Sequence, residues 1–507
     1  MSKPTPRPHG VGVRGATLTR SSLLFEGPFG RIFRALPPAE FGADGGASEK
    51  ALAVLANKMK AKHDPPKDGP DDEEGGIPAA YTYFGQFIDH DLTFDPASSL
   101  QRQNDLDALV DYRTPRFDLD SVYGRGPDDQ PYLYEDGSSF VLGRQLTGAA
   151  ANPKAKDLPR SGSRRRAIIG DPRNDENVIV SQLQGLFLRL HNKLATDSAN
   201  KNWSFERLQR EVRFHYQWVV LNDFLPTIVD HKVLRDVLPH LAKKTNVHLD
   251  KPKLEFYKAA KHESYMPLEF SAAAYRFGHS MVRPGYRLSE TIGPLAIFAT
   301  DPNKALTGFR EFPSNWAIDW NLFMDLQPRD PDDKTRTQLA YRIDTSLVDP
   351  LGHLPASVAS NPSNLAERNL RRGWRMRLPT GQDVARAMGI VPLKDKDILI
   401  GKFTGDDEDI IGPIDKIHPA FKDTCPLWTY VLAESIESTV TIKTTKGPRK
   451  IKTRRLGPVG GRIVAETIVG LMVYDSNSYV SQHPLWTPGL AVKGKFGLRE
   501  LILAALS

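Results

Sequence analysis

Cysteine is almost absent from this chain. Its 507 residues include one cysteine, Cys425, so no disulfide can form within the chain. A small fold held together by several disulfides is therefore excluded. A protein of a reducing compartment and a disulfide-free secreted protein both fit this composition.

Long apolar runs are missing as well. No stretch approaches the roughly 20 consecutive apolar residues of a membrane-spanning helix. Residues 1–20 contain arginine, proline and glycine but lack the apolar segment of a signal peptide. We therefore expect a cytoplasmic protein without a membrane span, with export by a signal-independent route left open.

A strong excess of one charge is also absent. The 68 lysines and arginines against 61 aspartates and glutamates leave a formal net charge of +7, and much of it falls in residues 154–166 and 443–455. These two basic stretches contain few aromatic side chains that could stack on bases. Solvated surface loops explain them, and we expect no nucleic-acid partner.

Helical periodicity dominates what is present. Hydrophobic residues make up 40% and charged residues 25%, as in ordinary globular proteins, while 39 glycines and 39 prolines predict many turns. Alternation typical of a strand is confined to residues 439–443 and Ile451. We predict a mainly α fold with long loops and very little β, in which a flexible arm (residues 1–22) precedes a single large helical domain (residues 23–507). Helices are predicted in the following ranges: 81–94, 171–194, 204–225, 270–283, 361–375, 381–388, 427–437, 459–474 and 498–506.

The stretch 81–94 carries four chemically capable side chains in an otherwise apolar run. In a helix, Gln86 and His90 share one face with Asp89 beside them, and Asp91 is turned about 100° from His90. A lone histidine on an apolar helix is more often a buried structural residue than a functional one. Other segments of the chain favour a functional role for His90.

Several segments, taken in order, resemble the signature segments of the animal-type haem peroxidases, a family of the peroxidase–cyclooxygenase superfamily. Any one of them alone is weak, but their order and rough separation are preserved. The resemblance extends from residue 26 to residue 488, and the missing signal peptide and disulfides point to a bacterial-type member. The segments are Gln86 to Asp91, residues 114–124, Arg173 with Glu176, residues 275–279, and residues 459–466.

The resemblance implies a haem b cofactor held by residues in the second half of the chain. His279 corresponds to the axial ligand of the haem iron, and Arg276 and Arg372 correspond to arginines that neutralise the haem propionates. Asn369 corresponds to an asparagine that accepts a hydrogen bond from the ligand imidazole. A buried structural histidine is the alternative for His279.

The same resemblance assigns the opposite side of the haem. His90 corresponds to the base that moves a proton between the two peroxide oxygens, and the fixed charge of Arg173 favours the developing anion. Gln86 is placed to order a water or a small anion. A plain surface salt bridge from Arg173 to Asp175 or Glu176 is the alternative for that segment.

Asp89 and Glu176 correspond to two carboxylates that form ester bonds to haem methyl groups in many members of the family. Some members have a methionine directly after the second carboxylate, which adds a sulfonium link. This chain has Asn177 there, so the third link is not expected. We expect at least partial attachment of the haem through the two esters.

A calcium site is implied by the loop that follows the first helix. Asp91, Thr114, the backbone carbonyl of Arg116, Asp118 and Asp120 correspond to the family's calcium ligands, and hard oxygen ligands of this kind suit Ca²⁺. By themselves, aspartates two residues apart are more often an ordinary acidic turn.

The resemblance implies a peroxidase that reduces hydrogen peroxide and oxidises small organic donors, halide or thiocyanate. Cyclooxygenase-type relatives carry a radical-forming tyrosine three residues before the axial histidine, where this chain has Arg276. Tyr275 is one residue earlier, about 100° away around an α-helix. The alternatives are a fatty-acid dioxygenase that uses another tyrosine, and a non-catalytic haem- or calcium-binding adhesive protein.

Overall fold

The structure, a computed structural model, describes residues 27–507 except residues 64, 94–109, 112, 163–164, 261–262 and 360. The predicted flexible arm, residues 1–22, lies outside the described residues. Among the described residues, no helix combines the length and the apolar composition needed to cross a membrane.

Helices make up most of the regular structure, and polar caps begin many of them. Asn177 and Ser204, for example, accept hydrogen bonds from backbone N–H groups in the first turns of their helices. The helices are α1 (Gly45–Lys58), α2 (Ala80–Leu92), α3 (Asp120–Tyr123), α4 (Val178–Thr196), α5 (Phe205–Val219), α6 (Leu225–Ile228), α7 (His231–Val237), α8 (Pro239–Lys243), α9 (Leu268–Ser271), α10 (Asp349–Gly352), α11 (Leu365–Arg375), α12 (Gly381–Ala387), α13 (Ile414–Ile417), α14 (Leu427–Ala433), α15 (Pro458–Val473), α16 (Tyr479–Gln482) and α17 (Leu498–Leu506).

The strands are short, apart from one hairpin. β10 and β11 pair antiparallel with Val440 opposite Ile451, which confirms the strand predicted at residues 439–443. β3, β1 and β4 form a three-stranded sheet, and β2 pairs with β7, β5 with β6, and β8 with β9. The mainly α prediction is therefore confirmed. The strands are β1 (Gly27–Gly30), β2 (Glu74–Pro78), β3 (Val110–Asp111), β4 (Met266–Pro267), β5 (Gly285–Tyr286), β6 (Leu295–Ala296), β7 (Leu339–Tyr341), β8 (Leu399–Gly401), β9 (Ile410–Pro413), β10 (Ile436–Thr444) and β11 (Gly447–Arg455).

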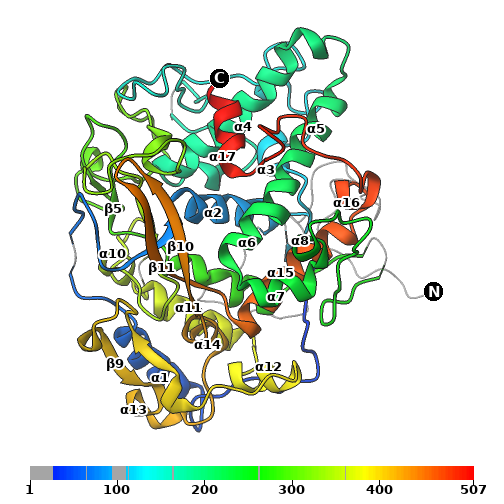
Figure 1. Cartoon of the computed structure of the whole chain (residues 1–507). Helices are drawn as coiled ribbons and strands as arrows, with labels where there is room; N and C mark the ends of the chain where they lie inside the picture. The colour runs from blue at the N-terminus through cyan, green and yellow to red at the C-terminus, as the bar shows by residue number, and fades with distance from the viewer. Residues whose placement is uncertain are drawn as a thin grey trace.

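Helix α2 runs through the middle of the molecule, between α4, α5 and α17 on one side and α11 and α14 on the other (Figure 1). Its aromatic side chains pack into the main core: Phe87 stacks on Phe187 of α4 with ring centroids 4.5 Å apart. Between Ala80 and Leu92 only Gly85, Gln86 and Asp89 keep partial exposure, and they share one face of the helix. The face that carries Gln86 and Asp89 is therefore within reach of solvent.

The continuous helix predicted over residues 270–283 is wrong. α9 ends at Ser271, and Ala273 leaves the helical region with φ −139° and ψ −77°. A 3-10 segment then runs from Ala274 to His279. Because a 3-10 helix has three residues per turn, successive side chains are about 120° apart rather than about 100°.

The helix predicted over residues 204–225 extends further in the structure. A π-helical turn, Val220–Phe224, follows α5, and α6 continues the chain to Ile228. Pro226 lies in α6 directly after the π-helical turn, in which the N–H of Leu225 donates to the carbonyl of Val220.

Candidate active site and metal centre

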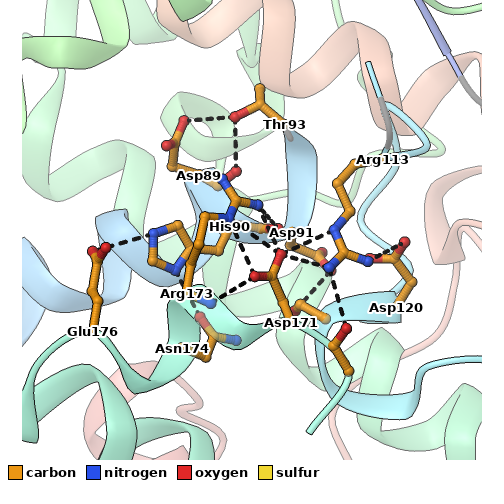
Figure 2. A network of polar contacts seen from close by, with 12 residues as sticks. Asp89, His90, Asp91, Thr93, Arg113, Asp120, Asp171, Arg173, Asn174 and Glu176 are labelled. Atoms are coloured by element: carbon orange, nitrogen blue, oxygen red, sulfur yellow. Dashed lines mark hydrogen bonds and ion pairs between the residues drawn. The ribbon is translucent and has the colours of Figure 1, made fainter. Parts of the chain in front are cut away.

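His90 lies near the end of α2 with both ring nitrogens close to polar atoms. Its side chain is buried, Nδ1 lies 2.8 Å from Oδ1 of Asn174, and Nε2 lies 3.5 Å from Oε1 of Glu176. Figure 2 shows the ring between Asn174 and Glu176, which come from the segment that leads into α4. The two residues singled out as base and ester carboxylate therefore lie side by side.

Gln86 is oriented by the cap of α4. Oδ1 of Asn177 accepts hydrogen bonds from the backbone N–H groups of Ile179 and Val180, so its Nδ2 must be the atom that donates to Oε1 of Gln86, at 3.1 Å. The Nε2 group of Gln86 then donates to Glu176. The amide of Gln86 thus presents a hydrogen-bond donor towards Glu176.

Arg173 is held by an aspartate that the sequence analysis did not single out. Its backbone N and its Nη2 each donate to the carboxylate of Asp171 at 2.8 Å, and Nη2 also donates to the backbone oxygen of His90 at 2.9 Å. Burial raises the pKa of Asp171, but hydrogen bonds and charge from Arg173 and Arg113 outweigh it and hold that pKa well below its usual range. Asp175, the other partner considered for Arg173, pairs with Arg160.

Three predicted calcium ligands form a compact acidic cluster. Oxygen atoms of Asp91, Asp118 and Asp120 all lie within 4.8 Å of one another, and Oγ1 of Thr114 donates to Asp118 at 2.6 Å. Oδ1 of Asp120 is buried and has no hydrogen-bond partner among the described residues. The backbone N of Arg116 donates to the carbonyl of Thr114, so Arg116 belongs to the same tight turn.

Burial and mutual repulsion disfavour the charged form of this cluster. Burial, then the neighbouring Asp118 and Asp120, raise the pKa of Asp91 well above its ordinary value. Burial, then the charge of Asp120, raises the pKa of Asp118 to about 7. A divalent cation coordinated by these oxygens would remove the repulsion. The donor set is oxygen throughout, which suits Ca²⁺ and not a soft metal.

His279 lies at the end of the 3-10 segment. Its Nδ1 is 2.8 Å from Nδ2 of Asn369 on α11, and Nη1 of Arg276 donates to Oδ1 of Asn369 at 3.0 Å. Burial, then the charge of Arg276, lowers the pKa of His279 to about 3, so the imidazole is neutral and able to bind a metal. The resemblance implies that the imidazole of His279 donates to the side-chain oxygen of Asn369. The structure instead turns the amide nitrogen of Asn369 to the ring.

Positive charge gathers around His279. Burial, then the charge of Arg372, lowers the pKa of Arg276 to about 10, and Arg368 adds to this repulsion while Asp89 opposes it. Such a group of like charges is suited to an anionic ligand. The hydroxyl of Tyr275 donates to the carbonyl of Gly85 at 3.1 Å, so the 3-10 segment touches the partly exposed face of α2.

Comparison with known proteins supports the resemblance found in the motifs. Residues 108–306 match the family model of the animal haem peroxidases. Over this segment the chain is therefore similar to that family. The chain is 29% identical over 215 residues to a chorion peroxidase of Aedes aegypti, a match that spans 40% of this chain and 24% of that protein. It is 27% identical over 246 residues to a myeloperoxidase of Homo sapiens, spanning 44% and 29%.

Solved structures share the fold of this chain at low sequence identity. Peroxidase A of Dictyostelium discoideum superposes with a TM-score of 0.56 at 15% identity, covering 95% of this chain and 93% of that one. A fatty acid α-dioxygenase of Oryza sativa with palmitic acid gives a TM-score of 0.50 at 14% identity, covering 93% and 78%. These likenesses concern the fold alone.

The residues around α2 and the 3-10 segment fit a haem. A neutral, half-buried imidazole, a group of arginines and a partly exposed helix face with carboxylate and amide groups match an iron, two propionates and the edge of a porphyrin. A separate cavity of about 720 Å³ lies between β2, the β10–β11 hairpin and residues 404–409. None of the predicted site residues lines that cavity, and its wall mixes both charges.

Proposed function

We propose that this haem peroxidase domain reduces hydrogen peroxide and oxidises small organic donors, halide or thiocyanate. The observation that carries the proposal is the meeting of two imidazole-bearing segments: α2 with His90, and the 3-10 segment with the neutral His279, joined by the hydrogen bond from Tyr275 to Gly85. A bound haem supplies the electron transfer between peroxide and donor.

On the side of His279, the protein binds and neutralises the cofactor. His279 is the iron ligand in this proposal, and Asn369 orients its ring. Arg276 and Arg372 pair with the propionates, which would relieve the repulsion between the two guanidinium groups. Asp89 and Glu176 supply the carboxylates for ester bonds to haem methyl groups.

On the side of His90, the protein moves a proton and stabilises charge. Nε2 of His90 accepts a proton from one peroxide oxygen and returns it to the other, a role suited to an imidazole. Arg173 contributes a positive charge held in place by Asp171. Gln86, with its donor turned to the site, binds a water or a small anion.

The acidic cluster binds Ca²⁺ in this proposal. Asp91, Thr114, the carbonyl of Arg116, Asp118 and Asp120 provide the ligands. Because Asp91 directly follows His90 in α2, the cation would fix the end of this helix to the loop before α3.

Rapid mixing with hydrogen peroxide tests the proposal. The purified protein, supplied with haem, should show a Soret band, a fast spectral change with peroxide, and then oxidation of a phenolic donor. His90→Gln should keep the Soret band and slow the peroxide step by at least about a hundred-fold, because general base catalysis typically contributes that much. His279→Ala should alter the Soret band itself. A protein that binds no haem, or a peroxide step unaffected by His90→Gln, would contradict the proposal.

A fatty-acid dioxygenase is the second candidate, and Tyr275 is the observation that favours it. The 3-10 geometry changes the direction expected for this side chain, and its hydroxyl reaches the site-facing helix α2 at Gly85. Oxygen uptake with palmitic acid that is abolished in Tyr275→Phe would support the dioxygenase. Donor oxidation that survives Tyr275→Phe supports the peroxidase. If the protein shows neither activity, it is a non-catalytic binding protein.

A further inference from the structure

The two ring nitrogens of His90 lie in different surroundings. Nδ1 faces the side-chain oxygen of Asn174 at 2.8 Å, in a contact that is fully buried. Nε2 faces the site, near Glu176. A neutral imidazole carries one proton, and the partner of one nitrogen decides which nitrogen holds it.

Asn174 is itself held by a second buried amide. Its Nδ2 donates to Oε1 of Gln184 on α4 at 2.9 Å, and neither Asn174 nor Gln184 is exposed. Because Asn174 uses its nitrogen on Gln184, its oxygen is the atom left for the imidazole. An oxygen can only accept, so Nδ1 of His90 must be the donor.

We propose that Asn174 and Gln184 are positioning residues that keep His90 in the tautomer with the proton on Nδ1 and the lone pair of Nε2 facing the site. The proposal deepens the proposed peroxidase function and rests on it, because a base that receives the peroxide proton at Nε2 needs that nitrogen unprotonated. Asn174 and Gln184 are both buried and act through His90.

The opposite hydrogen-bond direction is the competing arrangement. If both amides were turned over, Nδ2 of Asn174 would donate to Nδ1 of His90, and the proton would lie on Nε2. Nε2 of Gln184 has no hydrogen-bond partner among the described residues, so no further contact there locks the pair. The two arrangements differ in a property that can be measured, the position of the ring proton.

Nitrogen NMR of His90 reads that position directly. One sample carries histidine labelled with ¹⁵N at Nδ1 alone and a second at Nε2 alone, and the resonance of His90 is the one missing from His90→Gln. The ferrous carbon monoxide complex is diamagnetic and suits the measurement. We expect a protonated Nδ1 and an unprotonated Nε2. A proton on Nε2, in the other tautomer or in the doubly protonated ring, overturns the proposal.

Variants separate positioning from simple packing. Asn174→Leu removes the acceptor and should slow the peroxide step by about ten- to a hundred-fold, the usual cost of losing a partner that orients a ligand or base. Asn174→Asp keeps an acceptor for Nδ1, loses the donor to Gln184 and adds a negative charge. It should restore the rate to within about ten-fold of the parent and keep the proton on Nδ1. If the peroxide step stays slow in Asn174→Asp and the ring proton of His90 lies on Nε2, the proposal is contradicted.

Helix α4 offers a matched control. Gln182 is also buried and also uses its amide, which binds the carbonyl of Trp316 and the N–H of Ile318. Gln182→Leu and Gln184→Leu remove the same group from the same helix, so both should lower the Tm. Only Gln184→Leu should change the His90 resonances and slow the peroxide step. Equal effects of the two variants on the resonances would reduce Gln184 to a packing residue and overturn its assignment.

Failure of this inference is distinguishable from failure of the proposed function. If the parent reacts with peroxide and the proton is found on Nε2, the positioning role is wrong and the peroxidase stands. If the parent does not react with peroxide, the proposed peroxidase function is wrong. The positioning role of Asn174 and Gln184 in catalysis, which rests on that function, is then overturned whichever tautomer His90 has.

Discussion

Arg113 donates two hydrogen bonds to Asp171, from Nε at 3.1 Å and from Nη2 at 2.5 Å. Its third nitrogen, Nη1, lies 3.0 Å from Oδ2 of Asp120 in the acidic cluster. Since Asp171 also holds Arg173, a single guanidinium group connects the candidate calcium site to the arginine beside His90 (Figure 2).

Arg113→Lys tests this connection. A lysine keeps the charge but lacks the planar fork, so it cannot bind Asp120 and Asp171 at once. We expect the peroxide step to slow by about ten-fold while the Soret band stays unchanged, because Arg173 loses its fixed position. Stopped-flow absorbance measures both. Arg287→Lys is the control, since Arg287 makes a similar two-pronged contact with Asp68 in another part of the fold. An equal rate in the parent and Arg113→Lys would contradict the connection.

Calcium should stabilise the protein through the acidic cluster. At a hundred-fold excess over its dissociation constant, a ligand that binds only the folded state adds about 2.7 kcal/mol. We therefore expect the chelator-treated protein to unfold several degrees lower, and Mg²⁺ to restore less than Ca²⁺. Differential scanning calorimetry checks this. Asp118→Asn should abolish the calcium effect, whereas Asp136→Asn, in an exposed turn, should retain it. A calcium effect that persists in Asp118→Asn would place the ion elsewhere.

Much of this arrangement is predictable from sequence. The apolar spacing of α2 and α4 locates both helices, and the order of the motifs brings Gln86, His90 and Glu176 together. The break at Ala273 is not predictable, because it depends on contacts from elsewhere, such as the indole of Trp428 donating to the carbonyl of Arg276 at 3.2 Å.

The supporting residues were missed for a related reason. Asn174 lies 84 residues from its partner His90, and Arg113 lies 58 residues from Asp171. Neither pair has a spacing that marks it as a contact. Residues 171–177 were predicted to open the helix, but the structure has a 3-10 turn at Pro172–Asp175, where Asp171 accepts a hydrogen bond from the backbone N–H of Arg173.

Asn177→Asp should reverse the amide of Gln86 without weakening α4. Aspartate caps a helix as well as asparagine does, but it cannot donate to Oε1 of Gln86. Gln86 would then turn its nitrogen to the new carboxylate and its oxygen to Glu176. We expect fluoride to bind the ferric protein about ten-fold more weakly, because a donor near the site becomes an acceptor. Spectral titration measures the affinity, and an unchanged Tm confirms the cap. Undiminished fluoride binding in Asn177→Asp would contradict this role.

The buried carboxyl group of Glu434 should make stability depend on pH. It accepts hydrogen bonds from the N–H groups of Val459 at 2.9 Å and Gly460 at 2.6 Å at the start of α15, and burial raises its pKa to about 8. The folded state therefore binds this proton more tightly than the unfolded chain does. The associated stability is complete below about pH 4.5 and is lost as pH rises through about 8.

Glu434→Gln tests this dependence because the amide stays neutral. We expect the Tm of this variant to equal or fall below that of the parent at pH 5 and to exceed it at pH 9, with a stability difference on the order of a few kcal/mol. Thermal unfolding at several pH values checks it. A Tm difference that does not change with pH would mean that Glu434 is already ionised at neutral pH.

The carboxylates of Asp89 and Glu176 are each held by a neighbour, as an ester-forming pair requires. Oγ1 of Thr93 donates to Asp89 at 3.2 Å, and Gln86 donates to Glu176. Each ester would join a carboxylate oxygen to a haem methyl carbon in place of one C–H bond, releasing one proton and two electrons. These, with a second proton from solvent, would reduce one hydrogen peroxide to two waters. We expect acid-acetone extraction to remove all haem from freshly loaded protein and only part of it after peroxide treatment. Asp89→Asn combined with Glu176→Gln should release all of it in both cases, and mass spectrometry of the haem-bearing peptides would show which residue is linked. Complete extraction from the peroxide-treated parent would leave both carboxylates as hydrogen-bonding groups alone.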